Sequence, residues 1–452
     1  MSSLLLRAKG AIVAAAFLFV LVPIASGQDP FAEGVRTTEP LTPDEERVTF
    51  TLPRGFRIEL VAAEPAIHKP MNVAFDARGR LWVTDSIEYP FAAPADRPGR
   101  DSVKVLEDRD QDGSFETITT FADGLNIPIG IYPTLDGCIV FSIPNIWYLR
   151  DTDGDGRADE RTPLYGPMGW ERDTHGMNNS FTRHFDGWLY ACHGFNNDTT
   201  VAGRDGHTIR MQSGNTYRMR LDGERVEQFT WGQVNPFGMT IDRLGNLFTA
   251  DCHSKPVYQL VRGGYYPSFG KPHDGLGFVP PIMEHLHGST AIAGVAILDD
   301  PDFPEEFRGN LVSGNVMTSR LNRNRLDVRG ASRTAVEQPD FLSTTDPWFR
   351  PVDVKLGPDG ALYVCDFYNR IIGHYEVPLT HPGRDRERGR LWRISRTVEP
   401  GHPARFLPDM TRDSDDQIIV RLASENTTER LLALNLLLDR HANRLPDAAR
   451  NR

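Results

Sequence analysis

The sequence predicts an all-β protein, a six-bladed β-propeller, that ends in a short α-helical segment. Three observations lead to this fold class. A strand–turn–strand pattern recurs six times, its copies lie between 50 and 64 residues apart, and from about Asp413 onward apolar side chains fall at helical spacing. Repeats of about 50 residues with short strands and glycine-containing turns are typical of propeller blades.

A glycine marks the turn in every copy of the repeat. The clearest copies are Pro70–Asp85, Asn235–Asp251 and Arg350–Asp366, each with an apolar strand before the turn and a second strand that ends in Asp. Two unrelated β-sandwiches are the alternative, but they would not explain this fixed internal order. The six turn glycines are Gly79, Gly137, Gly187, Gly245, Gly309 and Gly360, at intervals of 58, 50, 58, 64 and 51 residues.

The two ends of the repeat region are predicted to pair with each other. Phe56–Val61 alternates like a strand before the first blade, and Gly389–Ile394 follows the last one, so we expect the two to join in the sixth blade and remove an open edge. Leucines and isoleucines from Ile418 to Leu437 then predict two helices, with Asn426 as the N-cap of the second. The pair either packs on the propeller or begins a helical repeat.

The N-terminal residues have the order of a secretory signal. Arg7 and Lys9 precede an apolar run from Ala11 to Val22, and Ala25–Gly27 offers small residues for cleavage. The prediction is an exported, periplasmic or extracellular protein; an uncleaved N-terminal segment that associates with a membrane is the alternative. The expected division is a signal peptide at 1–27, an extension at 28–51, the propeller at 52–396, a linker at 397–412 and the helical segment at 413–452.

Composition excludes several classes of partner and cofactor. The chain has 50 basic and 61 acidic residues, a net charge of −11, and no long basic run, so a nucleic-acid groove is not expected. The four cysteines are too few for a disulfide scaffold, and none has the spacing for covalent haem. We therefore expect buried thiols and no haem in this chain.

The strand order of a propeller places the candidate site at one rim of the central channel. Residues just before each innermost strand and just after the strand that follows it meet at the same face. A purely structural role is the alternative for the strand-end aspartates, since such side chains bond local backbone amides. The rim residues are His68, Lys69, Asn126, His175, Asn235, His287 and Arg350 from strand starts, and Asp85, His193, Asp251 and Asp366 from strand ends.

Two acidic loops have the layout of calcium sites on the face opposite this rim. Oxygen-bearing residues stand at positions 1, 3, 5 and 9, position 7 offers a backbone carbonyl, and glycine stands at position 6. Strand-like residues flank both loops, which indicates hairpin tips rather than EF-hands; solvated turns without metal are the alternative. The candidate ligands are Asp108, Asp110, Asp112, Ser114 and Glu116 in one loop and Asp151, Asp153, Asp155, Arg157 and Asp159 in the other.

Several of these segments resemble a known family. Residues 52–396 are similar to the soluble quinoprotein sugar and sorbosone dehydrogenases, through Leu52–Phe56, Pro70–Asp85, His175, Asn235–Met239, Thr290–Gly294 and Arg350–Tyr363. Still closer is the resemblance to the membrane-bound dehydrogenase domain abundant in planctomycete-type bacteria, through His175–Asn178, Tyr190–Gly194 and Asp366–His374.

The resemblance implies a quinoprotein that oxidises a sugar or alcohol hydroxyl with pyrroloquinoline quinone (PQQ). His175 would be the general base, with Arg350 and Asn235 completing the catalytic set. Lys69, Asn235, Asp251, Arg350, His374 and Arg384 would bind the cofactor, which carries three carboxylates. An external electron acceptor, such as a cytochrome c, would be needed. Val234 stands where the sugar dehydrogenases typically carry Arg, which removes one cation from that side.

A non-catalytic propeller that binds carbohydrate or protein is the alternative function. It predicts a filled channel with His175 buried against its neighbours. The dehydrogenase predicts an open cleft into which His175 points.

Overall fold

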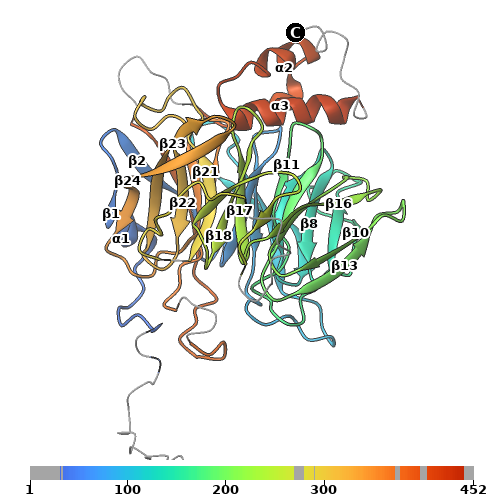
Figure 1. Ribbon diagram of the computed structural model, residues 1–452, viewed down its shortest axis with the longest axis horizontal. Coiled ribbons are helices and arrows are strands. Elements are labelled where there is room, and N and C mark those ends of the chain that lie inside the picture. Colours follow the sequence, from blue (N-terminus) through green and yellow to red (C-terminus); the bar gives the residue numbers. More distant parts are fainter. Residues whose placement is uncertain are drawn as a thin grey trace, which may run out of the picture.

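The computed structural model describes residues 31, 34–268, 279–289, 291–371, 377–397 and 405–441. Its strands form six blades arranged in a ring, together with one separate hairpin, and two helices lie across one face (Figure 1). The innermost strand of each sheet contacts the innermost strand of the next, and the contact between β25 (Pro351–Leu356) and β3 (Pro70–Phe75) closes the ring. The predicted six-bladed propeller is confirmed.

The first three blades follow one another along the chain, except that β20, the outermost strand of blade 3, comes after the strands of blade 4. Blade 1 contains β3, β4 (Leu81–Asp85), β5 (Asp101–Glu107) and β6 (Thr117–Leu125). Blade 2 contains β7 (Ile129–Pro133), β8 (Gly137–Ser142), β9 (Asn145–Arg150) and β10 (Glu160–Tyr165). Blade 3 contains β11 (Asn179–Arg183), β12 (Leu189–His193), β15 (Asn215–Met219), β16 (Val226–Gly232) and β20 (Tyr265–Tyr266), with a separate hairpin of β13 (Asp198–Ala202) and β14 (Thr208–Gln212).

Two of the last three blades, blades 5 and 6, include a strand from the N-terminal region. Blade 4 contains β17 (Asn235–Ile241), β18 (Leu247–Cys252) and β19 (Val257–Leu260). Blade 5 contains β21 (Ile292–Ile297), β22 (Leu311–Asn315), β23 (Arg320–Arg329), β24 (Ser332–Thr344) and β1 (Phe50–Thr51). Blade 6 contains β25, β26 (Leu362–Asp366), β27 (Arg390–Arg396) and β2 (Phe56–Ala63).

The predicted closure of the ring is present in blade 6. β2 pairs antiparallel with β27 from Phe56 opposite Arg396 to Ala63 opposite Arg390. Five of the six turn glycines lie between the first and second strands of their blades, and Gly137 is the first residue of β8. Five of them, every one except Gly137, have positive φ, a conformation that glycine adopts without the steric cost other residues incur.

Every innermost strand has a register irregularity near its start. In each of the six first-to-second strand pairs the register shifts within the first few residues of the inner strand. At these shifts the backbones of neighbouring blades approach closely: a Cβ on Gly238 would lie 2.6 Å from the Cα of Gly294. At this contact between blades 4 and 5, the neighbouring backbone leaves no room for a Cβ on Gly238.

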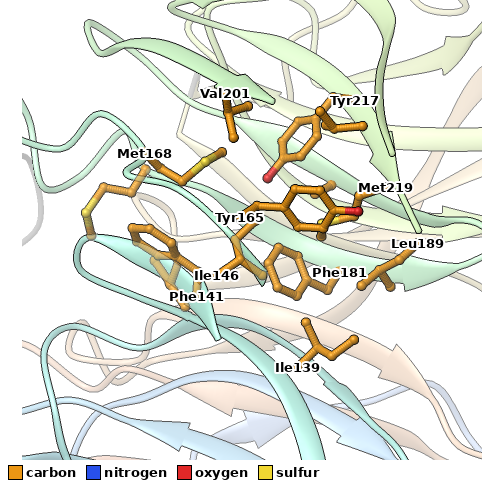
Figure 2. Packing of buried hydrophobic residues seen from close by; sticks show 14 of the residues in the cluster. Ile139, Phe141, Ile146, Tyr165, Met168, Phe181, Leu189, Val201, Tyr217 and Met219 are labelled. Atoms are coloured by element: carbon orange, nitrogen blue, oxygen red, sulfur yellow. The ribbon is translucent and has the colours of Figure 1, made fainter. Parts of the chain in front are cut away.

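Apolar side chains fill the space between adjacent blades. Figure 2 shows the largest cluster, in which Phe141 and Ile146 of blade 2 pack with Phe181, Leu189 and Tyr217 of blade 3. Along β8 and β12, the residues of this cluster alternate with residues that pack against the blade on the other side. Each blade thus buries both faces of its sheet, which is why the strands read as nearly continuous apolar runs.

The N-terminal region contains a short helix, α1 (Pro43–Arg47), and the C-terminal region contains η2 (Met410–Arg412), α2 (Asp415–Arg421) and α3 (Thr427–Arg440). Asn426 caps α3 by accepting a hydrogen bond from the Glu429 N–H, as predicted. The helices pack on the propeller face that carries the first turns of the blades: Leu407 contacts Gly79 and Leu438 contacts Gly187. Among the described residues, no helix has the length and apolar character needed to cross a membrane.

Candidate functional site

A cavity of about 630 Å³ lies at the rim that the strand order predicts. Starts of inner strands contribute Met71, Ile129, Asn235, Ile292 and Val352, and the segments after second strands contribute side chains such as Phe195 and Phe367. Its volume is in the range of sites for small organic ligands. The polar side chains in its lining are Tyr89, His175, Asn235, Cys252, His253, Ser289, Thr318, Asn369, Arg384, Asp385 and Arg386.

His175 is exposed and lines this cavity, as the dehydrogenase hypothesis predicts. The Asp173 carboxylate accepts a hydrogen bond from the His175 backbone N–H at 2.7 Å. The ring Nδ1 lies 2.7 Å from the hydroxyl of Tyr89, which comes from a loop of blade 1. The open cavity around His175 does not match the filled channel expected for the non-catalytic alternative.

Asn235 and Arg384 also line the cavity. The Asn235 side-chain oxygen accepts a hydrogen bond from the Phe195 N–H at 3.0 Å, which fixes the orientation of its amide. The Arg384 guanidinium donates to the backbone oxygens of Val377 at 2.6 Å and Pro378 at 3.2 Å. Arg386, from the same segment, also lines the cavity, so the segment that follows β26 reaches over the rim.

Lys69 is buried in the wall and is absent from the cavity lining, so its predicted contact with a cofactor is not supported. Its ammonium donates to the backbone oxygens of Phe367 and Tyr368 and forms an ion pair with Asp385 at 2.9 Å. Burial lowers the pKa of Lys69 to about 8, although Asp385 opposes the shift. The side chain ties blade 1 to the insertion of blade 6.

Arg350 is also buried behind the rim rather than in the lining. Its Nη1 donates to the Ser319 hydroxyl and to the Phe349 carbonyl, both at 3.0 Å. Burial lowers the pKa of this guanidinium to about 9. Its position does not support the predicted direct contact with a reacting substrate.

The three strand-end aspartates have a structural role. Asp85 accepts the backbone N–H groups of His68 and Lys69, and Asp366 accepts that of Arg350. Asp251, predicted to bind the cofactor, instead accepts from the backbones of Val234 and Asn235 and is fully buried. In all three blades the carboxylate anchors the start of the inner strand. His193 is likewise buried, between Thr199 and Ser213.

His374, a predicted cofactor ligand, lies outside the described residues. The repeat pattern did not single out Tyr89, Cys252 or His253, although all three line the cavity. Cys252 and His253 directly follow Asp251 at the end of β18, so their place after a second strand was a usable signal. Tyr89 lies deeper in an irregular loop, where repeat spacing gives no information.

The two acidic loops gather carboxylates as predicted, with one exception. Oxygens of Asp108, Asp110, Asp112 and Glu116 lie within 4.8 Å of one another, as do oxygens of Asp151, Asp153 and Asp159. Asp155 is not in the second group, and its carboxylate accepts from the Arg157 N–H at 2.8 Å. Gly113 contacts Phe406, so the first loop lies on the helix-bearing face, opposite the cavity.

The residues of the cavity fit a flat, anionic cofactor of the PQQ type in two respects. Two guanidinium groups and the Asn235 amide can bind carboxylates, and apolar side chains such as Met71 and Phe237 offer surfaces for a planar ring system. The volume is sufficient for such a group and a small substrate. Because Lys69 and Arg350 are engaged in the wall, the described part of the lining supplies Arg384 and Arg386 as its cations.

Comparison with known proteins gives a family and a fold. The family model for a domain of unknown function, DUF7133, matches residues 42–398. An oxidoreductase (glucose dehydrogenase) from Thermus thermophilus is similar over 75% of this chain and 100% of that one, with 19% identity and a TM-score of 0.51. The PQQ domain of pyranose dehydrogenase from Coprinopsis cinerea, in its holo form, is similar over 77% and 97%, with 15% identity and a TM-score of 0.51. No curated protein matches the sequence.

Proposed function

The chain belongs to the DUF7133 family, a domain of unknown function, and we propose that it is a quinoprotein dehydrogenase that oxidises a sugar or alcohol hydroxyl. One observation carries the proposal: an exposed imidazole, His175, and two guanidinium groups, Arg384 and Arg386, line the same rim cavity. A base beside an anion-binding wall is what hydroxyl oxidation with an acidic cofactor requires.

The chain's own residues divide the work between proton transfer and binding. His175 removes the proton of the substrate hydroxyl, since an imidazole is the side chain that most often serves as a general base. Arg384, Arg386 and Asn235 are the residues that would hold PQQ, because guanidinium and amide groups donate to carboxylates. When bound, the quinone supplies a two-electron acceptor. The apolar part of the lining excludes water from the reacting groups.

The fold similarity supports the same class of reaction. The similar structures are described as a glucose dehydrogenase and as the PQQ domain of a pyranose dehydrogenase. At identities of 19% and 15% they share the fold with this chain, and the proposal for this chain rests on its cavity residues.

Reconstitution tests this function directly. Purified protein is mixed with PQQ and Ca²⁺, and reduction of an artificial electron-accepting dye is followed over a panel of sugars and alcohols. We expect a change in the quinone absorbance on binding and turnover with at least one substrate. His175→Gln should reduce turnover by about 100-fold or more and leave quinone binding intact.

Arg262→Gln serves as the matched control, because Arg262 is an exposed arginine whose ion pair with Glu227 lies away from the cavity. Arg384→Gln should weaken quinone binding about 10-fold or more, and Arg262→Gln should not change it. The absence of both an absorbance change and turnover would refute the proposal. Sugar binding without oxidation would favour the non-catalytic propeller.

We further propose that the two acidic loops bind Ca²⁺ and stabilise the face opposite the cavity. The carboxylate groups around Asp108 and Asp151 support this, since hard oxygen ligands suit calcium. Calcium added to chelator-treated protein should raise the midpoint of thermal unfolding. The double variant Asp110→Asn/Asp153→Asn should lose that response, and Asp123→Asn, at an exposed position, should keep it. An unchanged midpoint at millimolar Ca²⁺ would contradict calcium binding.

Export and an external electron acceptor, such as a cytochrome c, complete the proposal. Expression of the full chain in a bacterium, followed by N-terminal sequencing of the periplasmic fraction, tests for cleavage near Gly27. Retention of an intact N-terminus in the membrane fraction would favour the uncleaved segment instead.

A further inference from the structure

His175 and Tyr89 form a contact between two blades that are not neighbours. Tyr89 follows β4 of blade 1, and His175 precedes β11 of blade 3. The Tyr89 hydroxyl lies 2.7 Å from His175 Nδ1, and the ring centroids are 6.1 Å apart. Both side chains line the rim cavity. The imidazole therefore meets the cavity in an orientation that the phenol helps to set.

The loop that carries Tyr89 is held in place by its own network. Asp101 accepts the backbone N–H groups of Ile87 and Glu88, and the hydroxyl of Ser86. The Glu88 carboxylate pairs with Arg97 at 2.6 Å and with Arg100 at 2.9 Å. The phenol is thus presented from a fixed backbone.

Direct contacts join this loop to the segment that carries His175. The Thr174 hydroxyl donates to the Pro90 carbonyl at 2.5 Å. The Tyr89 ring packs edge-on against Phe367, with centroids 5.7 Å apart. These contacts restrict rotation of the phenol and leave its hydroxyl directed at the imidazole.

The phenol is a neutral partner for the imidazole. Burial raises the pKa of Tyr89 above its ordinary value, and the negative charge of Asp173 acts in the same direction. Tyr89 therefore remains protonated at neutral pH. Unlike a carboxylate, it holds the ring of His175 by a hydrogen bond without adding a negative charge beside it.

We propose that Tyr89 is a positioning residue for His175: because its hydroxyl engages Nδ1, a ring that acts as a base carries its proton on Nδ1, donates it to the Tyr89 oxygen and exchanges the substrate proton at Nε2. This inference rests on the proposed function. In the step, the O–H bond of the substrate hydroxyl breaks and an N–H bond forms at Nε2. The proton remains on the ring, which becomes an imidazolium with its Nδ1–H still donated to the Tyr89 oxygen.

The tautomer of His175 provides a test that requires no substrate. In protein labelled with ¹⁵N-histidine, the His175 signals are identified by their loss in His175→Gln, and their shifts report which ring nitrogen carries the proton. We expect Nδ1 to be protonated and Nε2 to be unprotonated in the neutral ring. A proton on Nε2 in the wild type would overturn the inference, whether or not any variant folds.

Two tyrosine variants separate positioning from general stability. Tyr89→Phe keeps the ring packing and removes the hydroxyl, so it should give a mixture of His175 tautomers. Tyr165→Phe removes a buried hydroxyl that bonds the Arg220 and Arg225 carbonyls elsewhere, and it should leave the tautomer unchanged. An unchanged tautomer in Tyr89→Phe would refute the positioning role.

The kinetic readout distinguishes this inference from the proposed function. If turnover is found, Tyr89→Phe should lower kcat about 10-fold with KM unchanged, since the hydroxyl acts on the base and not on substrate binding. An unchanged kcat would contradict the inference. If the NMR spectrum shows the predicted tautomer but no substrate is oxidised, the dehydrogenase proposal is refuted and the hydrogen bond between Tyr89 and His175 is still supported.

Discussion

At the scale of single residues, the strand-end aspartates all have a structural role, although the sequence predicted cofactor binding for Asp251. Asp251 accepts two backbone N–H groups at the start of β17 and a hydrogen bond from Ser254. Asp85 and Asp366 make the equivalent contacts in blades 1 and 6. The residue type alone does not show whether such an aspartate is structural or binds a ligand. Its hydrogen bonds to backbone N–H groups at the strand start show that it is structural.

The buried carboxyl of Asp251 should make stability depend on pH. Burial raises its pKa to about 7, against about 3.9 in an unfolded chain. The folded state therefore favours the protonated acid. The contribution of this group to the free energy of unfolding is fully present below about pH 4 and is lost as the pH rises to about 7. Asp251→Asn resembles the protonated acid, so the wild type should lose up to about 4 kcal/mol relative to the variant over that range.

Urea unfolding at pH 4, 5.5 and 7 measures this difference. Asp96→Asn removes one carboxyl at an exposed position and serves as the control. A difference between Asp251→Asn and wild type that stays constant across the range would show that Asp251 is ionised throughout.

At the scale of elements, hydrogen bonds between inner strands hold the blades in a ring. The Asn72 side chain of β3 accepts the Gly130 N–H of β7 at 2.7 Å and donates to Asp353 of β25 at 3.3 Å. The Ser180 hydroxyl of β11 accepts the Gly238 N–H of β17 at 2.6 Å. Backbone groups that the register shifts leave without a strand partner are thus paired across blade boundaries.

Asn72→Ala should therefore destabilise the ring. The substitution leaves the buried Gly130 N–H and one Asp353 oxygen with fewer partners, at an expected cost of about 2–4 kcal/mol in unfolding free energy. Asn246→Ala is a matched control, since that half-buried amide bonds Asp242 within a single turn and should cost about 1 kcal/mol or less. Urea denaturation of both variants gives the comparison. Equal losses of unfolding free energy in the two variants would show that the Asn72 hydrogen bonds between blades add no stability.

The same register shifts explain which parts of the site were predictable from sequence. The short apolar strands and the turn glycines predicted the blade order and the rim, because both features recur at a regular interval along the sequence. The direction of a side chain at a strand start does not follow from alternation once a shift intervenes. Lys69 and Arg350 accordingly lie in the wall, and His175 and Asn235 reach the cavity.

At the scale of the whole molecule, α3 covers the end of the channel opposite the cavity. A second hollow of about 140 Å³ is lined by Leu431 and Asn435 of α3 together with inner-strand residues such as Ile241 and Lys355. The spacing of apolar residues predicted the helix. The apolar face of a helix does not specify what it packs against, so the sequence left two alternatives: packing on the propeller and the start of a helical repeat. The structure shows packing on the propeller: the Thr428 hydroxyl of α3 donates to the Leu356 carbonyl, and the side-chain amide of the N-cap Asn426 donates to the Gly357 carbonyl.

Two ion pairs join the C-terminal segment to the propeller, and their burial differs. Asp439 of α3 pairs with Arg183 of β11 at 2.7 Å, and the Arg183 side chain is fully buried. Glu425, just before α3, pairs with Arg243 at 3.5 Å, and both side chains are exposed. Removing one partner of a buried pair leaves an uncompensated charge, whereas an exposed pair is screened by water.

Asp439→Ala should therefore loosen the helix from the propeller, and Glu425→Ala should not. We expect a loss of about 1–3 kcal/mol for Asp439→Ala, because the carboxylate is partly exposed and Arg183 keeps its bond to Tyr132 at 2.9 Å. For Glu425→Ala we expect about 0.5 kcal/mol or less. Amide hydrogen exchange of the buried α3 residues Leu436 and Leu437 checks where the loss occurs. Faster exchange confined to α3 would show that the helix detaches before the propeller unfolds. Equally faster exchange in β11 and β17 would show instead that α3 and the propeller unfold as one unit.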